Sequence, residues 1–279
     1  MRLNKRKIMD KLMLGVISAL AVASTIPIFA IIINVYSEGA RQITPNFLID
    51  PPPPPIGGKG GGIGPALVGS LILISLTLLI GGSIGFFTGL YLSEFSHTRL
   101  AQYTQMFLQI MVEFPTIIVG LFAYMILVAP LKRFNALAGA IALSIIIIPY
   151  VALNVREAYK SIPYTLKEAA FSLGVSAPIA YLRILLSAAR RGVLTALLIG
   201  MAKAAGETAP LLLTILGTTF TYFGGLDQPI NAIPLLIYNF ALSPYEKWHQ
   251  VAWGAAAVLL TIILVIFVIS RLMVREAKI

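Results

Sequence analysis

Three ionisable residues lie within or beside long apolar stretches of the sequence: Glu113, Lys203 and Glu207. A charged side chain at the centre of a membrane-spanning helix costs roughly 2.5–3.5 kcal/mol, so it requires a partner or a water-filled path. Lys203 follows Val193, where its apolar stretch begins, by ten residues. Ten helical residues rise about 15 Å, which is half of the hydrocarbon thickness. The sequence therefore predicts a positive charge near the midplane of a bilayer.

Glu207 follows Lys203 by four residues, which predicts that both side chains lie on one face of a helix. The residues around Glu207 are small or weaken a helix: Gly206, Thr208 and Pro210. Small side chains let another helix or a substrate approach the backbone, and proline removes a helical hydrogen bond. Two interpretations stay open, namely a structural ion pair between helices and a transport path in which Lys203 contacts an anion.

A polar helix face precedes the third apolar stretch. Its members recur at spacings of three and four residues: Gln102, Gln105, Gln109 and Glu113. This face either lines an inner vestibule or faces the cytoplasm, and the spacing favours neither. Pro115 is predicted to kink the same helix.

The composition indicates that a bilayer surrounds these residues. Hydrophobic residues make up 58% of the 279 positions and charged residues 11%, against about a quarter charged in soluble domains. Six apolar stretches are each long enough to cross ~30 Å of hydrocarbon. They cover residues 12–36, 66–93, 103–129, 137–154, 193–217 and 250–274. We therefore predict an all-α polytopic membrane protein with six transmembrane helices.

Several classes of chemistry are excluded by what the sequence lacks. Without cysteine, the chain has no thiolate metal site, disulfide or cysteine nucleophile. The two histidines, His97 and His249, lie far apart and no Ser/His/Asp set is convincing, so we predict neither a metal site nor a catalytic site. The net charge of +10 is explained by basic cytoplasmic segments, not by nucleic-acid binding.

Lysine and arginine are distributed unequally between the two sides of the predicted membrane. With the N-terminus placed inside, fifteen of the 21 lie on the cytoplasmic side, five lie outside, and Lys203 lies within a span. This asymmetry predicts that both termini are cytoplasmic. A cleaved signal peptide is the alternative for the first stretch, because Ala21-Val22-Ala23 follows a basic start. The apolar run, however, continues to Val35, which is too long for a signal core.

The chain divides into a basic tail with the first helix at 1–36, an external linker at 37–65, a helical core at 66–274 and a cytoplasmic tail at 275–279. Prolines at 51–55 favour an extended stretch and the glycines after them a flexible one, so the linker is predicted to be a spacer that isolates the first helix. A phosphate-binding loop is excluded, because the glycines lack the GxxxxGK[ST] spacing and follow no strand.

The cytoplasmic segment 155–192 is predicted to fold. Ser161 and Pro163 are start signals for a short helix, and Gly174 is a stop signal. Ser176, with a proline two residues later, opens a second short helix. The segment is therefore predicted to contain two short helices hinged at Gly174.

Within this segment, Glu168-Ala169-Ala170, Gly174 and Ile184 resemble the EAA loop of ABC-importer permeases. The resemblance extends over the helical core and implies the MetI-like permease fold with cytoplasmic coupling helices. It also implies that this coupling loop docks into a groove on a separate ATPase. The residues suit that role, because the two alanines give a low-relief surface, Glu168 supplies a charge and Gly174 allows a bend.

A narrower resemblance is to the phosphate permease subunits of such importers. It rests on Gly206-Glu207-Thr208-Ala209-Pro210 after a basic residue at 203, and on the segments 89–94 and 114–121. It implies a multi-pass protein of the prokaryotic plasma membrane. The implied partners are a second homologous permease subunit in a heterodimer, two ATPase subunits, an extracytoplasmic phosphate-binding protein and membrane lipid. ATP is then used by the ATPase partner, and this chain holds no cofactor.

Under this resemblance, Glu207 is expected to accept a hydrogen bond from a phosphate hydroxyl, which sulfate lacks at neutral pH. Closure of the ATPase dimer is expected to push the loop at 168–174, and the loop is expected to move the fifth span. The site around Lys203 and Glu207 would then open alternately to the two sides of the membrane. Three alternatives differ in class: a permease for another oxyanion, an ion-coupled secondary transporter in which Glu207 or Glu113 carries the proton, and an intramembrane enzyme. The chain lacks the internal repeats that are frequent in secondary transporters and lacks catalytic motifs.

Overall fold

The computed structural model describes residues 2–56 and 61–275, and this part of the chain is helical, with one isolated bridge between Leu216 and Ile230. The glycine stretch at 57–60, with Lys59, and the tail at 276–279, with Lys278, lie outside the described residues. The α-helices are α1 (Arg2–Gly39), α2 (Pro45–Ile49), α3 (Gly64–Thr77), α4 (Ser83–Glu94), α5 (Arg99–Glu113), α6 (Thr116–Ala123), α7 (Ala136–Lys160), α8 (Tyr164–Ser172), α9 (Ala177–Ile179), α10 (Leu186–Gly206), α11 (Ala209–Thr214), α12 (Ile233–Ala241) and α13 (Glu246–Arg275).

Short irregular helical turns connect several of these helices. A 3₁₀ turn at Ala40–Gln42 follows α1. Three π-helical turns, at Leu78–Gly82, Tyr124–Val128 and Ala180–Leu185, join α3 to α4, extend α6, and join α9 to α10. The joined pieces therefore act as longer helices than their separate bounds indicate.

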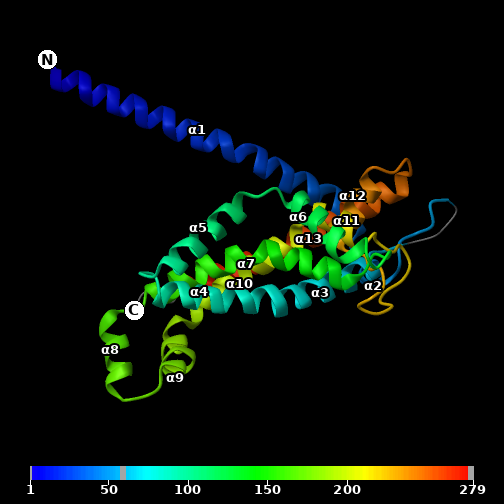
Figure 1. Cartoon of the computed structure of the whole chain (residues 1–279). Helices are drawn as coiled ribbons and strands as arrows, with labels where there is room; N and C mark the ends of the chain where they lie inside the picture. The colour runs from blue at the N-terminus through cyan, green and yellow to red at the C-terminus, as the bar shows by residue number, and fades with distance from the viewer. Residues whose placement is uncertain (1, 57–60, 276–279) are drawn as a thin grey trace.

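The described residues contain five helical stretches that are long and apolar enough to cross a membrane. They are Met9–Gln42, Gly64–Glu94, Ala136–Lys160, Ala177–Gly206 and Glu246–Leu272. A sixth span results if the bent pair Arg99–Glu113 and Thr116–Val128 crosses as one unit. The all-α polytopic fold predicted from the sequence is thus confirmed, with five candidate spans in the described residues, or six if the bent pair is one span. The start of α1 and the end of α13 lie toward the same end of the bundle as α8 and α9 (Figure 1).

The third and fifth spans differ from the continuous helices that the sequence predicted. At residues 103–129 the helix bends by 102° between α5 and α6, because Pro115 lacks a backbone N–H and restricts the residue before it. At residues 193–217 the helix ends at Gly206, four residues before Pro210, whose ring excludes a helical carbonyl at that position. The fifth span also begins at Ala177, well before the predicted start.

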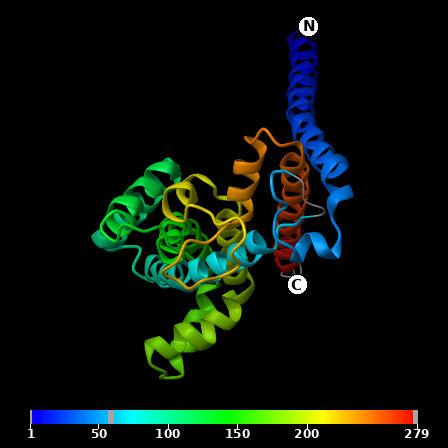
Figure 2. The same cartoon turned by 90° about the vertical axis from the view of Figure 1, so that its right-hand side faces the viewer.

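The linker at 37–65 does not isolate α1, so this prediction was wrong. The Tyr36 hydroxyl hydrogen-bonds Thr261 on α13 at 2.9 Å. Phe47 of α2 is buried among residues of α3, α12 and α13, and the Trp248 indole donates to the carbonyl of Pro53 at 3.0 Å. Only the last part of α1 packs against α13, while its first part lies apart from the other helices (Figure 2). The described part of the linker is therefore a packed segment.

Helix α7 is the centre of the fold, with α4 on one side and α10 on the other. Glycines along the α3–α4 span allow close approach, because a Cβ at Gly81 would lie 2.8 Å from the Cα of Ser144 and one at Gly85 would lie 2.8 Å from the Val151 Cβ. Close backbone approach through small residues is the usual way that membrane helices pack. The same α7 also carries α10, which holds the charged pair described next.

Candidate functional site

Lys203 and Glu207 form an ion pair at the C-terminal end of α10. The Lys203 Nζ lies 2.6 Å from the Glu207 Oε1, and the two side chains are 35% and 10% exposed. Lys203 is in the last turn of the helix, whereas Glu207 is the first residue beyond it and has an extended backbone. The predicted pairing across four residues therefore forms, although the helix does not continue through Glu207.

The break after Gly206 is built from the residues that flank Glu207. Thr208 is the residue directly before the short helix α11, and its carbonyl accepts hydrogen bonds from the backbone N–H groups of Leu211 and Leu212 at 3.1 Å. Pro210 is buried against α6, where a Cβ at Gly120 would lie only 2.6 Å from the Pro210 Cα. The segments 114–121 and 206–210, which the sequence singled out separately, therefore meet at this break.

Tyr150 on α7 is a member of the site that sequence reasoning missed. The Lys203 Nζ lies 5.7 Å from the centroid of the Tyr150 ring, which is within the range of a cation–π contact. The available signal was a polar aromatic residue after Pro149 within an otherwise apolar stretch. An ammonium group has three donors, and one is directed to Glu207. The others remain available for an anion on the exposed side of Lys203.

Tyr150 also lines an apolar pocket of about 320 Å³ formed by α5, α6 and α7. The other walls include Phe107, Met111, Phe114 and Val119. The pocket lies inside the 102° bend between α5 and α6. The aromatic ring that faces Lys203 is therefore in contact with the inner surface of a broken helix pair.

Glu113 stands apart from this pair. It is the last residue of α5 and is exposed, and in the described part of the chain no ion pair joins it to Lys203. Gln102 and Gln109 on the same helix are also exposed, whereas Ala101 and Leu108 on an adjacent face are buried. Both interpretations of this polar face, vestibule and solvent surface, are compatible with that exposure.

The coupling loop contains one separate helix, not two. Glu168 and Ala169 of α8 are exposed, while Ala170 is buried against α7 and the following π-turn. Gly174 ends the element with φ +70°, and a Cβ there would meet nothing within 4 Å. The predicted helix start at Ser161 was wrong, because Ser161 caps the end of α7 and its hydroxyl donates to the Ala158 carbonyl at 2.7 Å.

The second predicted loop helix is the beginning of the fifth span. Ser176 precedes α9 as predicted, but α9 continues through the π-turn Ala180–Leu185 into α10. Ile184 in this turn packs against the buried cluster that α7 and α10 share. A helix of 30 residues, Ala177–Gly206, therefore runs from the coupling loop to the turn that holds Lys203.

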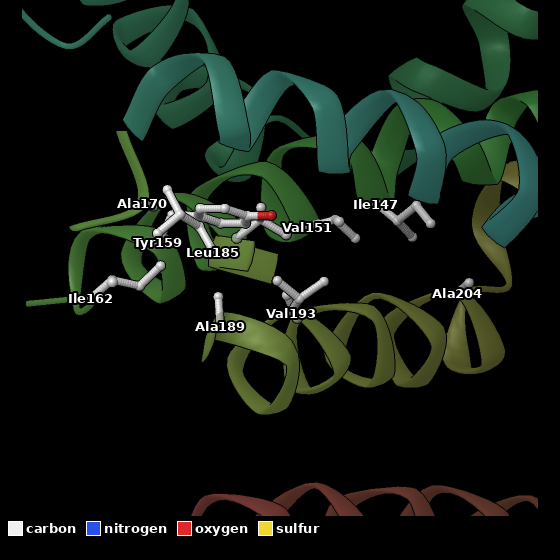
Figure 3. Packing of buried hydrophobic residues seen from close by; sticks show 11 residues of the cluster. Ile147, Val151, Tyr159, Ile162, Ala170, Leu185, Ala189, Val193 and Ala204 are labelled. Atoms are coloured by element: carbon white, nitrogen blue, oxygen red, sulfur yellow. The ribbon is translucent and has the colours of Figure 1, made fainter. Parts of the chain in front are cut away.

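One buried cluster extends along the same path. Ala170, Tyr159 and Leu185 lie together at the loop end, and Ala204, the neighbour of Lys203, lies at the other end (Figure 3). Val151 and Val193 fill the space between α7 and α10. Side chains in such cores are close-packed, so displacement at one end is transmitted along the helix.

A second group that sequence reasoning missed joins the loop to the α3–α4 span. The two oxygens of the Glu94 carboxylate accept from different partners, the Lys167 Nζ at 2.6 Å and the Tyr181 hydroxyl at 2.9 Å. Glu94 closes the segment 89–94 that the sequence marked, yet its partners lie 73 and 87 residues away.

Comparison with known families places these features in context. The profile of a family described as "Binding-protein-dependent transport system inner membrane component" matches residues 81–278. The chain is 44% identical to the "Probable phosphate transport system permease protein PstA" of Methanocaldococcus jannaschii, over 97% of this chain and 95% of that relative. It is 35% identical to the "Phosphate transport system permease protein PstA" of Pasteurella multocida, over 96% and 95% of the two chains.

A solved structure with the same arrangement of helices is that of an inward-facing MetNI methionine ABC transporter. The TM-score is 0.61 at 16% identity, and the match covers 77% of this chain and 97% of that one. At this identity the likeness concerns the fold alone. It agrees with the MetI-like arrangement that the coupling-loop residues implied.

Proposed function

This chain belongs to the family of binding-protein-dependent transport system inner membrane components, and on that premise we propose that it is the permease subunit through which an ATP-driven importer moves inorganic phosphate inward. It is a multi-pass membrane protein and a transport subunit, not an enzyme. The observation that carries the choice of substrate class is a partly exposed ammonium, Lys203, held at a break in a spanning helix. Relatives named as phosphate permeases over nearly the whole chain support phosphate as the anion.

The site residues have distinct roles in this proposal. Lys203 donates to phosphate oxygens through the ammonium protons that Glu207 does not use. Glu207 accepts from the phosphate hydroxyl, so a fully deprotonated anion such as sulfate leaves this carboxylate facing a like charge. Gly206, Thr208 and Pro210 keep the backbone open beside the pair, and Glu113 lies on the route toward the cytoplasm.

The coupling loop and the orientation complete the proposal. Glu168, Ala169, Ala170, Gly174 and Ile184 form the element that an ATPase subunit pushes. Both termini are assigned to the cytoplasm, in the prokaryotic plasma membrane, because lysine and arginine concentrate on that side. The position of α8 at the same end as the start of α1 and the end of α13 supports this orientation (Figure 1). The complete importer contains a second homologous permease subunit, two ATPase subunits that use the ATP, and an extracytoplasmic phosphate-binding protein.

The test is uptake of labelled phosphate and labelled sulfate by proteoliposomes that contain the chain with its partner proteins and internal ATP. We expect phosphate uptake that requires ATP, and we expect Glu207→Gln to reduce the preference for phosphate over sulfate by about tenfold, the effect of losing one charge-assisted hydrogen bond. Glu246→Gln, at an exposed position of α13, is the matched control. Uptake of another oxyanion in place of phosphate would refute the substrate, and uptake driven by a proton gradient without ATP would refute the mechanism.

A further inference from the structure

Glu94 occupies the point where the second span meets the coupling loop. It is the last residue of α4, at the loop end of the Gly64–Glu94 span. Its side chain is 14% exposed and that of Lys167 is 18% exposed, so the pair is largely shielded from water. A carboxylate in such surroundings is stabilised only when its oxygens are hydrogen-bonded, and here both are.

The two bonds reach opposite sides of Gly174. Lys167 belongs to α8, which precedes the glycine, and Tyr181 belongs to the π-turn that follows it and leads into α10. The ring of Tyr181 also packs edge-on against Phe171 at 5.7 Å, and its carbonyl accepts from the Tyr159 hydroxyl at 3.2 Å. One carboxylate therefore connects three helices: α4, α8 and the extended α10.

We propose that Glu94 is a positioning residue that fastens the second span to both halves of the coupling loop, so that a push on the loop moves α4 and α10 together. Gly174 has φ +70° and no atom within 4 Å of where a Cβ would lie, so, apart from Ala170 and the Phe171–Tyr181 ring contact, Glu94 is the group that holds α8 to the helix after the glycine. Without Glu94, the push would be absorbed at the glycine and would not reach the turn that holds Lys203. The inference rests on the proposed ATP-driven transport, but not on phosphate being the solute.

Glu94→Leu is the informative substitution because it keeps a side chain of similar bulk and removes both carboxylate oxygens. Glu94→Gln would not break the connection, because its amide oxygen can still accept from Lys167 while its NH2 donates to the Tyr181 hydroxyl oxygen. In Glu94→Leu neither half of the loop stays hydrogen-bonded to α4. We expect ATP hydrolysis by the reconstituted complex to remain within about twofold, while phosphate transported per ATP falls by about tenfold.

The matched control is Glu157→Leu. Glu157 also pairs with a basic residue, Arg156 at 2.7 Å, near the same end of the bundle, but both belong to α7, so no separate elements are joined. We expect the control to leave transport per ATP unchanged. The charge exchange Glu94→Lys with Lys167→Glu should restore coupling, because the introduced ammonium can donate both to the new carboxylate and to the Tyr181 hydroxyl oxygen.

A distance measurement separates this inference from the choice of substrate. The chain has no native cysteine, so nitroxide labels can be attached at Phe95→Cys and Leu173→Cys, both exposed in the parent structure. With Glu94 intact, we expect ATP binding to leave the distance between the labels unchanged, and with Glu94→Leu we expect it to change. A parent distance that changes as much as the variant distance would refute the inference. So would Glu94→Leu lowering the thermal stability of the complex with transport per ATP unaltered. Absence of phosphate uptake with an unchanged parent distance would refute the substrate alone.

Discussion

Removing charge at Lys203 and at Glu207 is expected to have unequal effects on stability, because the two side chains are unequally buried. Lys203→Met leaves the Glu207 carboxylate, which is 10% exposed, without its ammonium partner. Glu207→Gln leaves an ammonium that is 35% exposed and can still reach water. The first change therefore creates an unpaired shielded charge, and the second does not.

The magnitudes follow from this difference. Removing one partner of a fully buried ion pair costs about 3–5 kcal/mol. Water reaches Lys203, so the cost of Lys203→Met is discounted to about 2 kcal/mol. Glu207→Gln exchanges a charged acceptor for a neutral one and is expected to cost less than about 1 kcal/mol. In the double variant no charge remains unpaired, so its cost should be close to that of Glu207→Gln alone.

The assay is thermal unfolding of the purified complex in detergent at neutral pH, with the parent, both single variants and the double variant in parallel. The expected order of Tm is parent, then Glu207→Gln and the double variant together, then Lys203→Met. Equal losses in the two single variants would contradict the reasoning. A double variant whose loss equals the sum of the single losses would show that the two groups do not interact as one buried unit.

Two further predictions concern the loop and the aromatic ring of the site. At Gly174 the backbone has φ +70°, so Gly174→Ala should destabilise the loop by about 1 kcal/mol. Gly174→Pro cannot adopt this angle, so it should uncouple ATP hydrolysis from transport while the protein still inserts. Normal transport per ATP by Gly174→Pro in proteoliposomes would show that the hinge lies elsewhere. Tyr150→Phe should retain the cation–π contact with Lys203, whereas Tyr150→Leu should lose its interaction energy of about 0.5–2 kcal/mol. When uptake is titrated against external phosphate, we expect a weaker apparent affinity for phosphate in Tyr150→Leu only. Equal affinities in both variants would contradict the contact.

Most of the fold could be predicted because each membrane-spanning helix is a continuous apolar stretch of the sequence. The angle of a break could not, because proline marks only the position at which the helix ends. Pro115 marks the break between α5 and α6, but the 102° angle there depends on where α6 packs, and α6 lies against α11 through the close approach of Gly120 to Pro210. The same limit explains the merged loop helix, since the exposed α9 continues through the π-turn Ala180–Leu185 into α10, whose residues Ala189 and Val193 pack in the cluster with α7.

In the candidate site, too, the features that depend on neighbouring residues could be predicted and those that depend on distant residues could not. Lys203 and Glu207 are four residues apart, so their pairing could be predicted from spacing. In the segment 155–192 the stop at Gly174 and the start after Ser176 were also local signals, whereas the continuation of α9 into α10 was not. Tyr150 and Glu94 act on partners that are distant in the sequence and come from other helices, so no spacing rule relates them to the site. Their types gave only a weak signal, namely a polar residue within or at the end of an apolar span.

The continuity of the Ala177–Gly206 helix decides where a push on the loop has its effect. A close-packed helix moves as a unit, so a displacement applied near Gly174 is carried along α10 with little loss until the backbone hydrogen bonds stop. The last of them joins the Glu207 N–H to the Ala204 carbonyl at 3.3 Å, directly after the turn that holds Lys203, and the next joins the Leu211 N–H to the Thr208 carbonyl in α11. The break in the span therefore coincides with the charged pair. Relative motion of α10 and α11 at this break changes the surroundings of Lys203 and Glu207.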